Sequence, residues 1–278
     1  MQRISVLGLG IIGAAWAKNL HADGLDLRAW NRTPKKDFPG FDPDLVHAVK
    51  GAEMIIIVVA DPPAVESILD TIEPHLTPGQ LVAQSSTISA EWTEKFCTRV
   101  EAKGAIFLEA PFTGSKLAAE ARKTIFYLGG PTATVEKARP VLARLAEQIL
   151  HIGEIGSAST LKLAMNLNLA IMSEALSEAL TLARSHGIPD DKFFAALQFN
   201  AGRSGYSDLK RPKFEQRDYS PQFSLKHMNK DLRLALETSG KLELPVTRAL
   251  KTLYDKGMDA GYAEDDLTGL IRVVENQK

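Results

Sequence analysis

The first half of the chain alternates short apolar runs with longer segments in which apolar residues recur at helical spacing. The short runs are bounded by turn residues and predict strands at 4–9, 25–30, 54–60, 80–85, 105–110, 124–128 and 148–152. The segments between them predict helices at 11–22, 64–72, 91–103 and 133–147. The run at 54–60 is apolar almost throughout, which indicates a parallel sheet covered on both faces. This half therefore predicts a doubly wound α/β domain of the Rossmann type.

The second half shows only helical patterns. Residues 158–185 contain no Pro or Gly and predict one long helix, which ends at His186-Gly187-Ile188-Pro189. Further helices are expected at 191–199, 225–239, 245–260 and 264–274, with a loop at 202–221 that covers a site. We therefore expect two domains, a dinucleotide-binding domain at 1–161 and an all-α domain at 162–278, joined through the long helix.

Composition narrows the classes of function. The 278 residues carry 33 Lys and Arg against 34 Asp and Glu, a net charge of −1, which argues against a nucleic-acid-binding protein. No apolar run reaches about 18 residues, so we expect no membrane segment. The single cysteine, Cys97, predicts no internal disulfide and no thiolate metal site, and we expect it to be inert in a helix. These features favour a cytoplasmic protein without a metal.

A glycine motif follows the first predicted strand directly. It reads Gly8-Leu9-Gly10-Ile11-Ile12-Gly13, and a predicted helix begins within it. In this context the first glycine permits a tight turn, the second admits a pyrophosphate, and the third lets helix and strand pack closely. The first N–H groups of the helix are then available to the phosphates. The motif predicts a dinucleotide site.

The end of the second predicted strand distinguishes NAD from NADP. NAD sites usually place an acidic residue there, whereas this chain reads Trp30-Asn31-Arg32-Thr33. Arg32 can bind a 2′-phosphate through charge-assisted hydrogen bonds, and Asn31 and Thr33 can add neutral ones. The alternative is that Arg32 is a solvated turn residue. The absence of an acid favours NADPH.

Four further segments carry a family resemblance. They read Glu109-Ala110-Pro111-Phe112-Thr113-Gly114-Ser115-Lys116, Gly153-Glu154-Ile155-Gly156, Lys162-Leu163-Ala164-Met165-Asn166 and Lys226-His227-Met228-Asn229-Lys230-Asp231-Leu232. In these segments, in their order and spacing, the whole chain resembles the β-hydroxyacid dehydrogenases, which include 3-hydroxyisobutyrate dehydrogenase. It is most similar to the glyoxylate/succinic semialdehyde reductase branch, on Asn31-Arg32-Thr33, Ala60-Asp61-Pro62, Gly114-Ser115-Lys116 and Phe223-Ser224-Leu225-Lys226-His227.

The resemblance implies a proton-transfer pair. Lys162 and Asn166 are four residues apart and share one face of the long helix. By the resemblance, Lys162 is the catalytic acid and base, and Asn166 orients it and the substrate. A lysine suits this task when burial lowers its pKa from about 10.4 toward roughly 7–8. On spacing alone, Lys162 is also consistent with a solvated lysine in the first turn.

The resemblance also implies the substrate and cofactor contacts. The loop at Thr113 and Gly114 binds a substrate carboxylate, although Thr113 stands where the family usually has Ser and Phe112 is bulkier than its usual counterpart. The substrate side further includes Ser115, Phe223 and Asp231, and the cofactor side includes Val59, Ala60, Thr87 and Lys230. Other interpretations remain open here: a helix cap for Ser86, Thr87 or Ser89, a solvated pair for Lys230 and Asp231, a core position for Phe223, and a structural role for His227.

These features predict an NADPH-dependent reductase of small aldehydes that carry a carboxylate. Glyoxylate would give glycolate, and succinic semialdehyde would give 4-hydroxybutyrate. Alternatives are 3-hydroxyisobutyrate or tartronate semialdehyde chemistry, an imine reductase, which typically lacks the lysine, and a non-catalytic dinucleotide-binding module. The long helix of about 28 residues has more apolar surface than one small domain can cover, which favours a homodimer or homotetramer.

Overall fold

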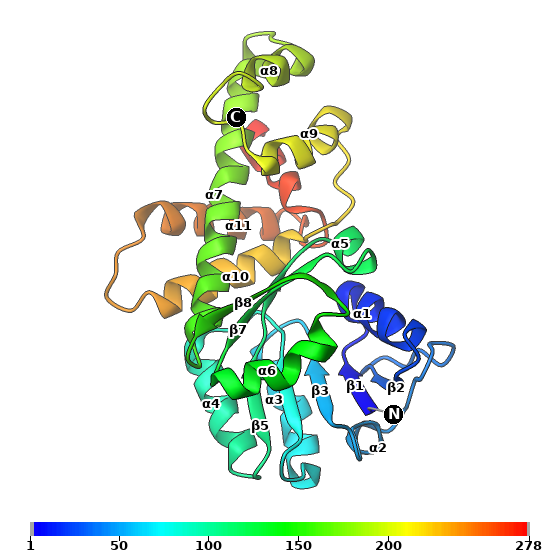
Figure 1. Ribbon diagram of the computed structural model, residues 1–278. Helices are drawn as coiled ribbons and strands as arrows, with labels where there is room; N and C mark the ends of the chain where they lie inside the picture. Colours follow the sequence, from blue (N-terminus) through cyan, green and yellow to red (C-terminus); the bar gives the residue numbers. More distant parts are fainter. Residues whose placement is uncertain (1–2, 277–278) are drawn as a thin grey trace. The chain divides into compact units, whose positions relative to one another are not determined.

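The computed structural model describes residues 3–276 (Figure 1). The chain divides into two compact units, Met1–Leu163 and Ala164–Lys278. The helix α7, Ser157–Ser185, contributes residues to both units. The expected fold class is confirmed, because a Rossmann-type sheet with helices on both faces is followed by a helical unit.

An eight-stranded sheet forms the centre of the first unit. Its strand order is β2-β1-β3-β4-β5-β7-β6, with β8 beside β7, and β1 to β5 are parallel. The order reverses at β1, so that β2 and β3 lie on either side of it, and ligands of such sheets bind at the carboxyl ends of the strands at this point. The strands are β1 (Arg3–Leu7), β2 (Asp26–Trp30), β3 (Met54–Ile57), β4 (Leu81–Gln84), β5 (Ile106–Glu109), β6 (Phe112–Thr113), β7 (Thr124–Gly129) and β8 (Ala146–Gly153).

Helices bury both faces of this sheet. Alternate residues of β3 point into two separate cores, with Met54 and Ile56 in one and Ile55 and Ile57 in the other. Each such side chain contributes about 1.5–3 kcal/mol when fully buried, which explains why the strand is apolar throughout. One core contains α1 (Ile11–Ala22), α5 (Lys116–Glu120) and α6 (Thr132–Leu142), and the other contains α2 (Leu45–Val49), α3 (Pro62–Ile72) and α4 (Ala90–Glu101).

The far side of the sheet differs from the predicted pattern in two ways. The strand β7 runs antiparallel to β5, because the chain first forms β6, which pairs back onto β7. The helix expected at 133–147 ends at Leu142, and Ala146 already begins β8. Pairing of β8 with β7 along most of both strands outweighs the local helical pattern there.

The second unit has only helical regular secondary structure in its described residues, 164–276. Its core joins α7 to the remaining helices through buried side chains such as Leu180, Phe194 and Tyr254. These helices are α8 (Asp190–Leu197), α9 (Gly205–Gln216), α10 (Leu225–Thr238), α11 (Pro245–Asp259) and α12 (Ile271–Glu275), with a 3₁₀ turn at Leu267–Leu270.

The loop predicted at 202–221 is wrong, because α9 occupies most of it. Ser204 and Ser207 form a capping box that begins the helix. Burial of Tyr206 and Phe214 then stabilises it in spite of Pro212, which lies inside the helix and removes one N–H donor.

Candidate active site

The glycine motif forms the turn between β1 and α1, and its three glycines have different environments. Gly8 has φ +107°, and a Cβ there would lie 2.2 Å from the carbonyl oxygen of Val58. A Cβ on Gly13 would lie 1.9 Å from the carbonyl oxygen of Gly8. At Gly10 a Cβ would meet no atom within 4 Å, so this glycine faces open space. Two glycines are required for packing, and the third leaves room for a ligand.

The N-terminus of α1 is available to an anion. Gly10 is its N-cap residue, and no side chain caps the first turn. The uncapped N–H groups of this turn, which begins at Ile11 and Ile12, carry the positive end of the helix dipole. An open glycine beside an uncapped helix N-terminus, at the reversal of the strand order, fits the pyrophosphate of a dinucleotide.

The segment after β2 places cations beside this loop. Asn31 fixes the loop, because its Oδ1 accepts a hydrogen bond from Leu9 N (2.8 Å) and its Nδ2 donates to the Thr33 carbonyl (2.8 Å). Thr33 is exposed. Arg32 is also exposed, and within residues 3–276 it forms no ion pair. The structure thus leaves a guanidinium at the position where NAD sites usually carry an acid.

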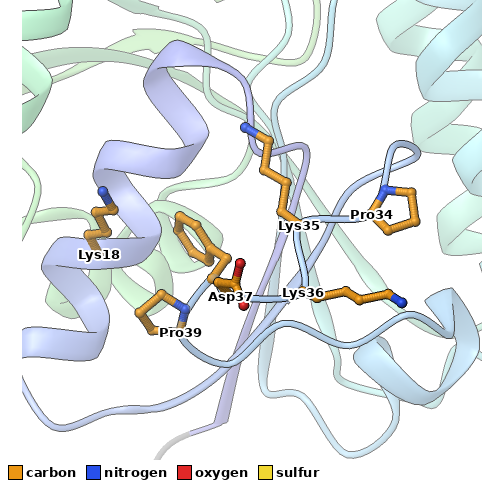
Figure 2. A pocket seen from close by; sticks show the side chains of 7 residues that line it. Lys18, Pro34, Lys35, Lys36, Asp37 and Pro39 are labelled. Carbon is orange, nitrogen blue, oxygen red and sulfur yellow. The ribbon is translucent and has the colours of Figure 1, made fainter.

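Lys35 is a further basic residue of this region, and no role for it was predicted. Its Nζ donates to the carbonyl oxygen of Leu9 (2.5 Å), inside the glycine motif. Figure 2 shows Lys35 directed toward the loop that precedes α1, whereas Lys36 points away from it. A hollow of about 530 Å³ between α1 and residues 34–39 is lined by these lysines and by Lys18. The sequence signal that could have identified Lys35 is its position shortly after Arg32.

The predicted carboxylate loop, Thr113 to Ser115, joins β6 to α5. Gly114 has φ +145°, a conformation that favours glycine, and Ser115 caps α5 by accepting a hydrogen bond from Ala118 N (3.3 Å). Thr113 is half-buried and Gly114 is exposed. Phe112 packs edge-on against Trp16, with 4.7 Å between ring centroids, and this contact accounts for its bulk.

Lys162 lies beside this loop. It belongs to the second turn of α7, and only 8 % of the residue is exposed. Its Nζ lies 6.0 Å from the centroid of the Phe112 ring, within the range of a cation–π contact. The burial of Lys162 rules out the solvated lysine, and the structure brings its Nζ next to the ring of Phe112, the residue that precedes Thr113.

In the second unit, Asn166, Asp231 and Lys230 form a buried polar chain. Asn166 Nδ2 donates to Asp231 Oδ2 (2.6 Å), and Lys230 Nζ forms an ion pair with Asp231 Oδ1 (2.9 Å). Asp231 is 3 % exposed, so the solvated charge pair is wrong. Phe223 packs against the helical core of this unit. Asn166 follows Lys162 by four residues on α7, and Asp231 fixes its amide.

His227 has a local partner of its own, because Ser224 Oγ and His227 Nδ1 are 2.7 Å apart. Burial, together with the positive charges of Lys230 and Lys226, lowers the pKa of His227 below its usual value. Both features favour the structural role.

The carboxyl ends of β3 and β4 contain the remaining predicted cofactor residues. Val59 N donates to Ser86 Oγ (2.8 Å), which ties the two strand ends together. The cap of α4 is Ser89, which accepts a hydrogen bond from Trp92 N. Thr87 is half-buried between these residues, and Ala60 is exposed. The cap position thus belongs to Ser89 rather than to Thr87.

Glu109 is a buried residue that belongs to a segment of the family resemblance, but no role for it was predicted. Its carboxylate accepts hydrogen bonds from backbone N–H groups at the start of α7, the helix that carries Lys162. Nothing in the spacing of Glu109 and the residues that it contacts, 47–50 positions apart, signals this contact.

Two other features concern metals and membranes. Within residues 3–276, no group of three or more His, Cys, Asp or Glu side chains is arranged to hold a metal ion. The same described residues contain no helix with the length and apolar character that a bilayer crossing requires.

The fold and these residues define a nicotinamide-dependent oxidoreductase, and comparison with known proteins gives its family. The sequence model of the NAD binding domain of 6-phosphogluconate dehydrogenase matches residues 3–153. The model described as NAD-binding of NADP-dependent 3-hydroxyisobutyrate dehydrogenase matches residues 156–274. The chain belongs to the β-hydroxyacid dehydrogenase family, as the resemblance predicted.

Named relatives match over almost the whole chain. Glyoxylate/succinic semialdehyde reductase 1 of Arabidopsis thaliana is 29 % identical over 289 residues and covers 99 % of both chains. The 2-hydroxy-3-oxopropionate reductase of Escherichia coli is 27 % identical over 284 residues and covers 99 % of this chain and 97 % of its own. The structure of Mycobacterium tuberculosis 3-hydroxyisobutyrate dehydrogenase with L-serine has a TM-score of 0.90, 27 % identity and 99 % coverage of each chain.

Proposed function

We propose that this chain is an NADPH-dependent reductase of small aldehydes that carry a carboxylate, converting glyoxylate to glycolate and succinic semialdehyde to 4-hydroxybutyrate. The observation that carries the proposal is the buried Lys162, whose Nζ lies 6.0 Å from the Phe112 ring beside the Thr113–Ser115 loop. A proton donor next to a hydroxyl and backbone N–H groups is the arrangement that reduction of a carboxylate-bearing aldehyde needs. The similarity to the Arabidopsis enzyme, named for these two substrates, supports the choice.

The preference for NADPH rests on charge at the end of β2. Arg32 is exposed, the chain has no acid at 31–33, and Lys35 adds a cation at the glycine motif. A guanidinium forms strong bidentate hydrogen bonds with a phosphate, whereas an unmodified ribose hydroxyl gains much less from it. The residues assigned to the cofactor are Gly8, Gly10, Ile11, Ile12, Gly13, Asn31, Arg32, Thr33, Val59, Ala60, Thr87 and Lys230.

Each side chain then has a defined task in the reaction. The bound nicotinamide supplies a hydride to the aldehyde carbon. Lys162 donates its proton to the carbonyl oxygen as negative charge develops there. Asn166, fixed by Asp231, orients the reacting groups, and the Thr113 hydroxyl with the Gly114 N–H binds the substrate carboxylate. Ser115 and Phe223 complete the proposed substrate side.

A second candidate is the oxidation of 3-hydroxyisobutyrate or the reduction of tartronate semialdehyde. The similarity to the E. coli and M. tuberculosis enzymes favours it at nearly equal identity. These reactions use the same proton transfer, so they differ from the first candidate only in the pocket near Phe112 and Thr113. We further propose a homodimer or homotetramer, because Leu182 on α7 and Phe199 after α8 are 64 % and 95 % exposed.

A substrate panel with both cofactors tests the proposal. NADPH oxidation should be faster than NADH oxidation with glyoxylate or succinic semialdehyde, and slower with tartronate semialdehyde. Because 3-hydroxyisobutyrate is already an alcohol, it is assayed by NADP+ reduction, which should also be slower. Lys162→Ala should lower kcat by about 10²–10⁴-fold while NADPH binding, measured by fluorescence titration, stays within about twofold. Lys103→Ala removes an exposed lysine and is the control. Full activity of Lys162→Ala, or turnover with NADH alone, would refute the corresponding part of the proposal.

A further inference from the structure

The start of α7 is capped by a carboxylate from a distant strand. Glu109, the last residue of β5, is completely buried. Its Oε2 accepts hydrogen bonds from Gly156 N (3.0 Å) and Ala158 N (3.2 Å), and its Oε1 accepts one from Ser159 N (2.5 Å). The first N–H groups of a helix have no partner within the helix. Glu109 therefore satisfies three of these donors at once.

The surrounding residues leave room for this carboxylate. Gly129 pairs with Glu109 across β5 and β7, and a Cβ on Gly129 would lie 2.0 Å from Glu109 Oε2. Gly156 has φ +94°, the left-handed conformation that brings its N–H to the carboxylate. Ser159 is fixed a second time, because its Oγ lies 2.9 Å from Thr93 Oγ1 on α4. The contact is thus built from several elements of the first unit.

This cap is one helical turn from the proposed proton donor. Ser159 and Lys162 are three residues apart on α7 and are neighbours on its surface. Helical side chains tilt toward the N-terminus, so the Lys162 side chain leans toward the turn that Glu109 holds. A displacement of this turn would move the lysine away from Phe112 and the Thr113 loop.

The cap also acts through its charge. The N-terminus of a helix carries about half a positive charge, which disfavours an ammonium group in the first turns. A buried carboxylate at the same place offsets that field. Burial raises the pKa of Glu109 above its usual value, while the hydrogen bonds from Ser159, Ala158 and Gly156 oppose the rise.

We propose that Glu109 is a positioning residue for proton transfer, which fixes the first turn of α7 and supplies the negative charge that keeps Lys162 in its proton-donating form. The inference rests on the proposed function of Lys162. Glu109 touches neither substrate nor cofactor in this proposal and acts only through the helix.

The test compares Glu109→Gln with Glu109→Asp. Glu109→Gln keeps the shape and removes the charge, so kcat at neutral pH should fall about 10–100-fold, with NADPH binding unchanged. The alkaline limb of the kcat profile should move to lower pH by about half to one unit, because the ammonium form is less favoured. Glu109→Asp keeps the charge but is one methylene shorter, so kcat should fall while the alkaline limb stays in place.

One further measurement and a matched control make the outcome decisive. The ¹³Cε shift of Lys162, followed against pH in the protein without cofactor, should titrate at lower pH in Glu109→Gln than in the wild type. Glu94→Gln is the matched control, because Glu94 is an exposed carboxylate whose Oε1 lies near Gly156, and it should leave all these quantities unchanged.

A folded Glu109→Gln protein with wild-type kcat and an unshifted Lys162 titration overturns the inference, and so does a loss of stability alone. If Glu109→Gln does not fold, wild-type kcat in Glu109→Asp overturns it. The proposed function fails separately, when Lys162→Ala retains activity whatever Glu109 does.

Discussion

The unfolding free energy of this protein should change with pH because of one buried carboxyl group in the second unit. Glu174 lies on α7, is 8 % exposed, and neither of its oxygens accepts a hydrogen bond from any residue in 3–276. Burial, followed by the charge of Glu178, raises the pKa of Glu174 to about 7 from an ordinary 4.5. The hydroxyl of the nearby Tyr254 is also buried, and it forms no hydrogen bond with the Glu174 carboxyl. The charge of an ionised Glu174 is therefore not compensated by a hydrogen-bond donor among the described residues.

The sign and size of the effect follow from these two values. The pKa is higher in the folded state than in the unfolded state, so the folded state binds the proton more tightly. The resulting stability is fully present below pH 4.5 and is lost as the pH rises through about 7. A difference of about 2.5 units corresponds to about 3 kcal/mol, since one unit is worth about 1.4 kcal/mol.

Glu174→Gln is the perturbation that isolates this term. Glutamine has nearly the same shape and stays neutral at every pH, so near pH 4.5 the variant should be less stable than the wild type only by the cost of its unpaired amide. At pH 8 it should be more stable, by up to about 3 kcal/mol less the cost of its unpaired amide, which is about 1–3 kcal/mol. The informative quantity is the difference in unfolding free energy between Glu174→Gln and the wild type at pH 8, minus the same difference at pH 4.5. The constant cost of the amide cancels in this quantity.

Urea unfolding followed by far-UV circular dichroism, repeated from pH 4.5 to pH 8, measures this difference. Glu178→Gln is the matched control, because it makes the same change on the same helix at an exposed position and should have a small effect. Parallel curves for the wild type and Glu174→Gln across this range would refute the assignment of a proton to the buried carboxyl.

Three further predictions concern the cofactor loop and the helical core. Gly13→Ala places a methyl group 1.9 Å from the Gly8 carbonyl oxygen, so NADPH binding should be lost while the protein remains folded; fluorescence titration showing wild-type affinity would contradict this. Arg32→Ala should weaken NADPH binding roughly 10–100-fold and NADH binding little; equal losses for both cofactors, measured by calorimetry, would show that Arg32 does not recognise the 2′-phosphate. Lys210→Met leaves the carboxylate of Asp266 buried without its ion pair and should cost about 3–5 kcal/mol in urea unfolding, and a cost under about 1 kcal/mol would exclude a buried charge there.

The sequence predicts most elements of the fold, because the period of the apolar residues is strong in both halves. The long helix is one example, expected at 158–185 and found as Ser157–Ser185. The predictions fail where tertiary contacts oppose a local signal. The polar composition of residues 202–221, with Gly and Pro, predicts a loop, but the Ser204 capping box and the burial of Tyr206 and Phe214 make most of that segment α9.

In the candidate site, too, features set by nearby residues could be predicted from the sequence, whereas contacts between distant residues could not. The glycine motif spans one turn between consecutive elements and the 162–166 spacing lies within α7, so their geometry follows from nearby sequence alone. The Lys35–Leu9 and Glu109–Ser159 hydrogen bonds join residues 26 and 50 positions apart. Such contacts depend on the strand order, and no spacing rule contains it. The family resemblance named Asn166 and Asp231 as site residues, but their hydrogen bond, which joins residues 65 positions apart, was not predicted.

In the first unit α1 and α6 have no side-chain cap, and of these two α1 begins at the reversal of the strand order, where an anionic cofactor is expected. Asp61 caps α3, Ser89 caps α4, Ser115 caps α5, and Glu109 satisfies the start of α7. The first turn of α1 has no side-chain cap, and Gly10 leaves it open. Each cap fills the N–H groups that an anion would otherwise bind, so phosphate binding is disfavoured at those helices and remains favourable at α1. At α7 the cap has the opposite consequence. The Glu109 carboxylate offsets the positive end of the helix dipole, so the ammonium group of Lys162 is tolerated near a helix N-terminus that would repel it if it were uncapped.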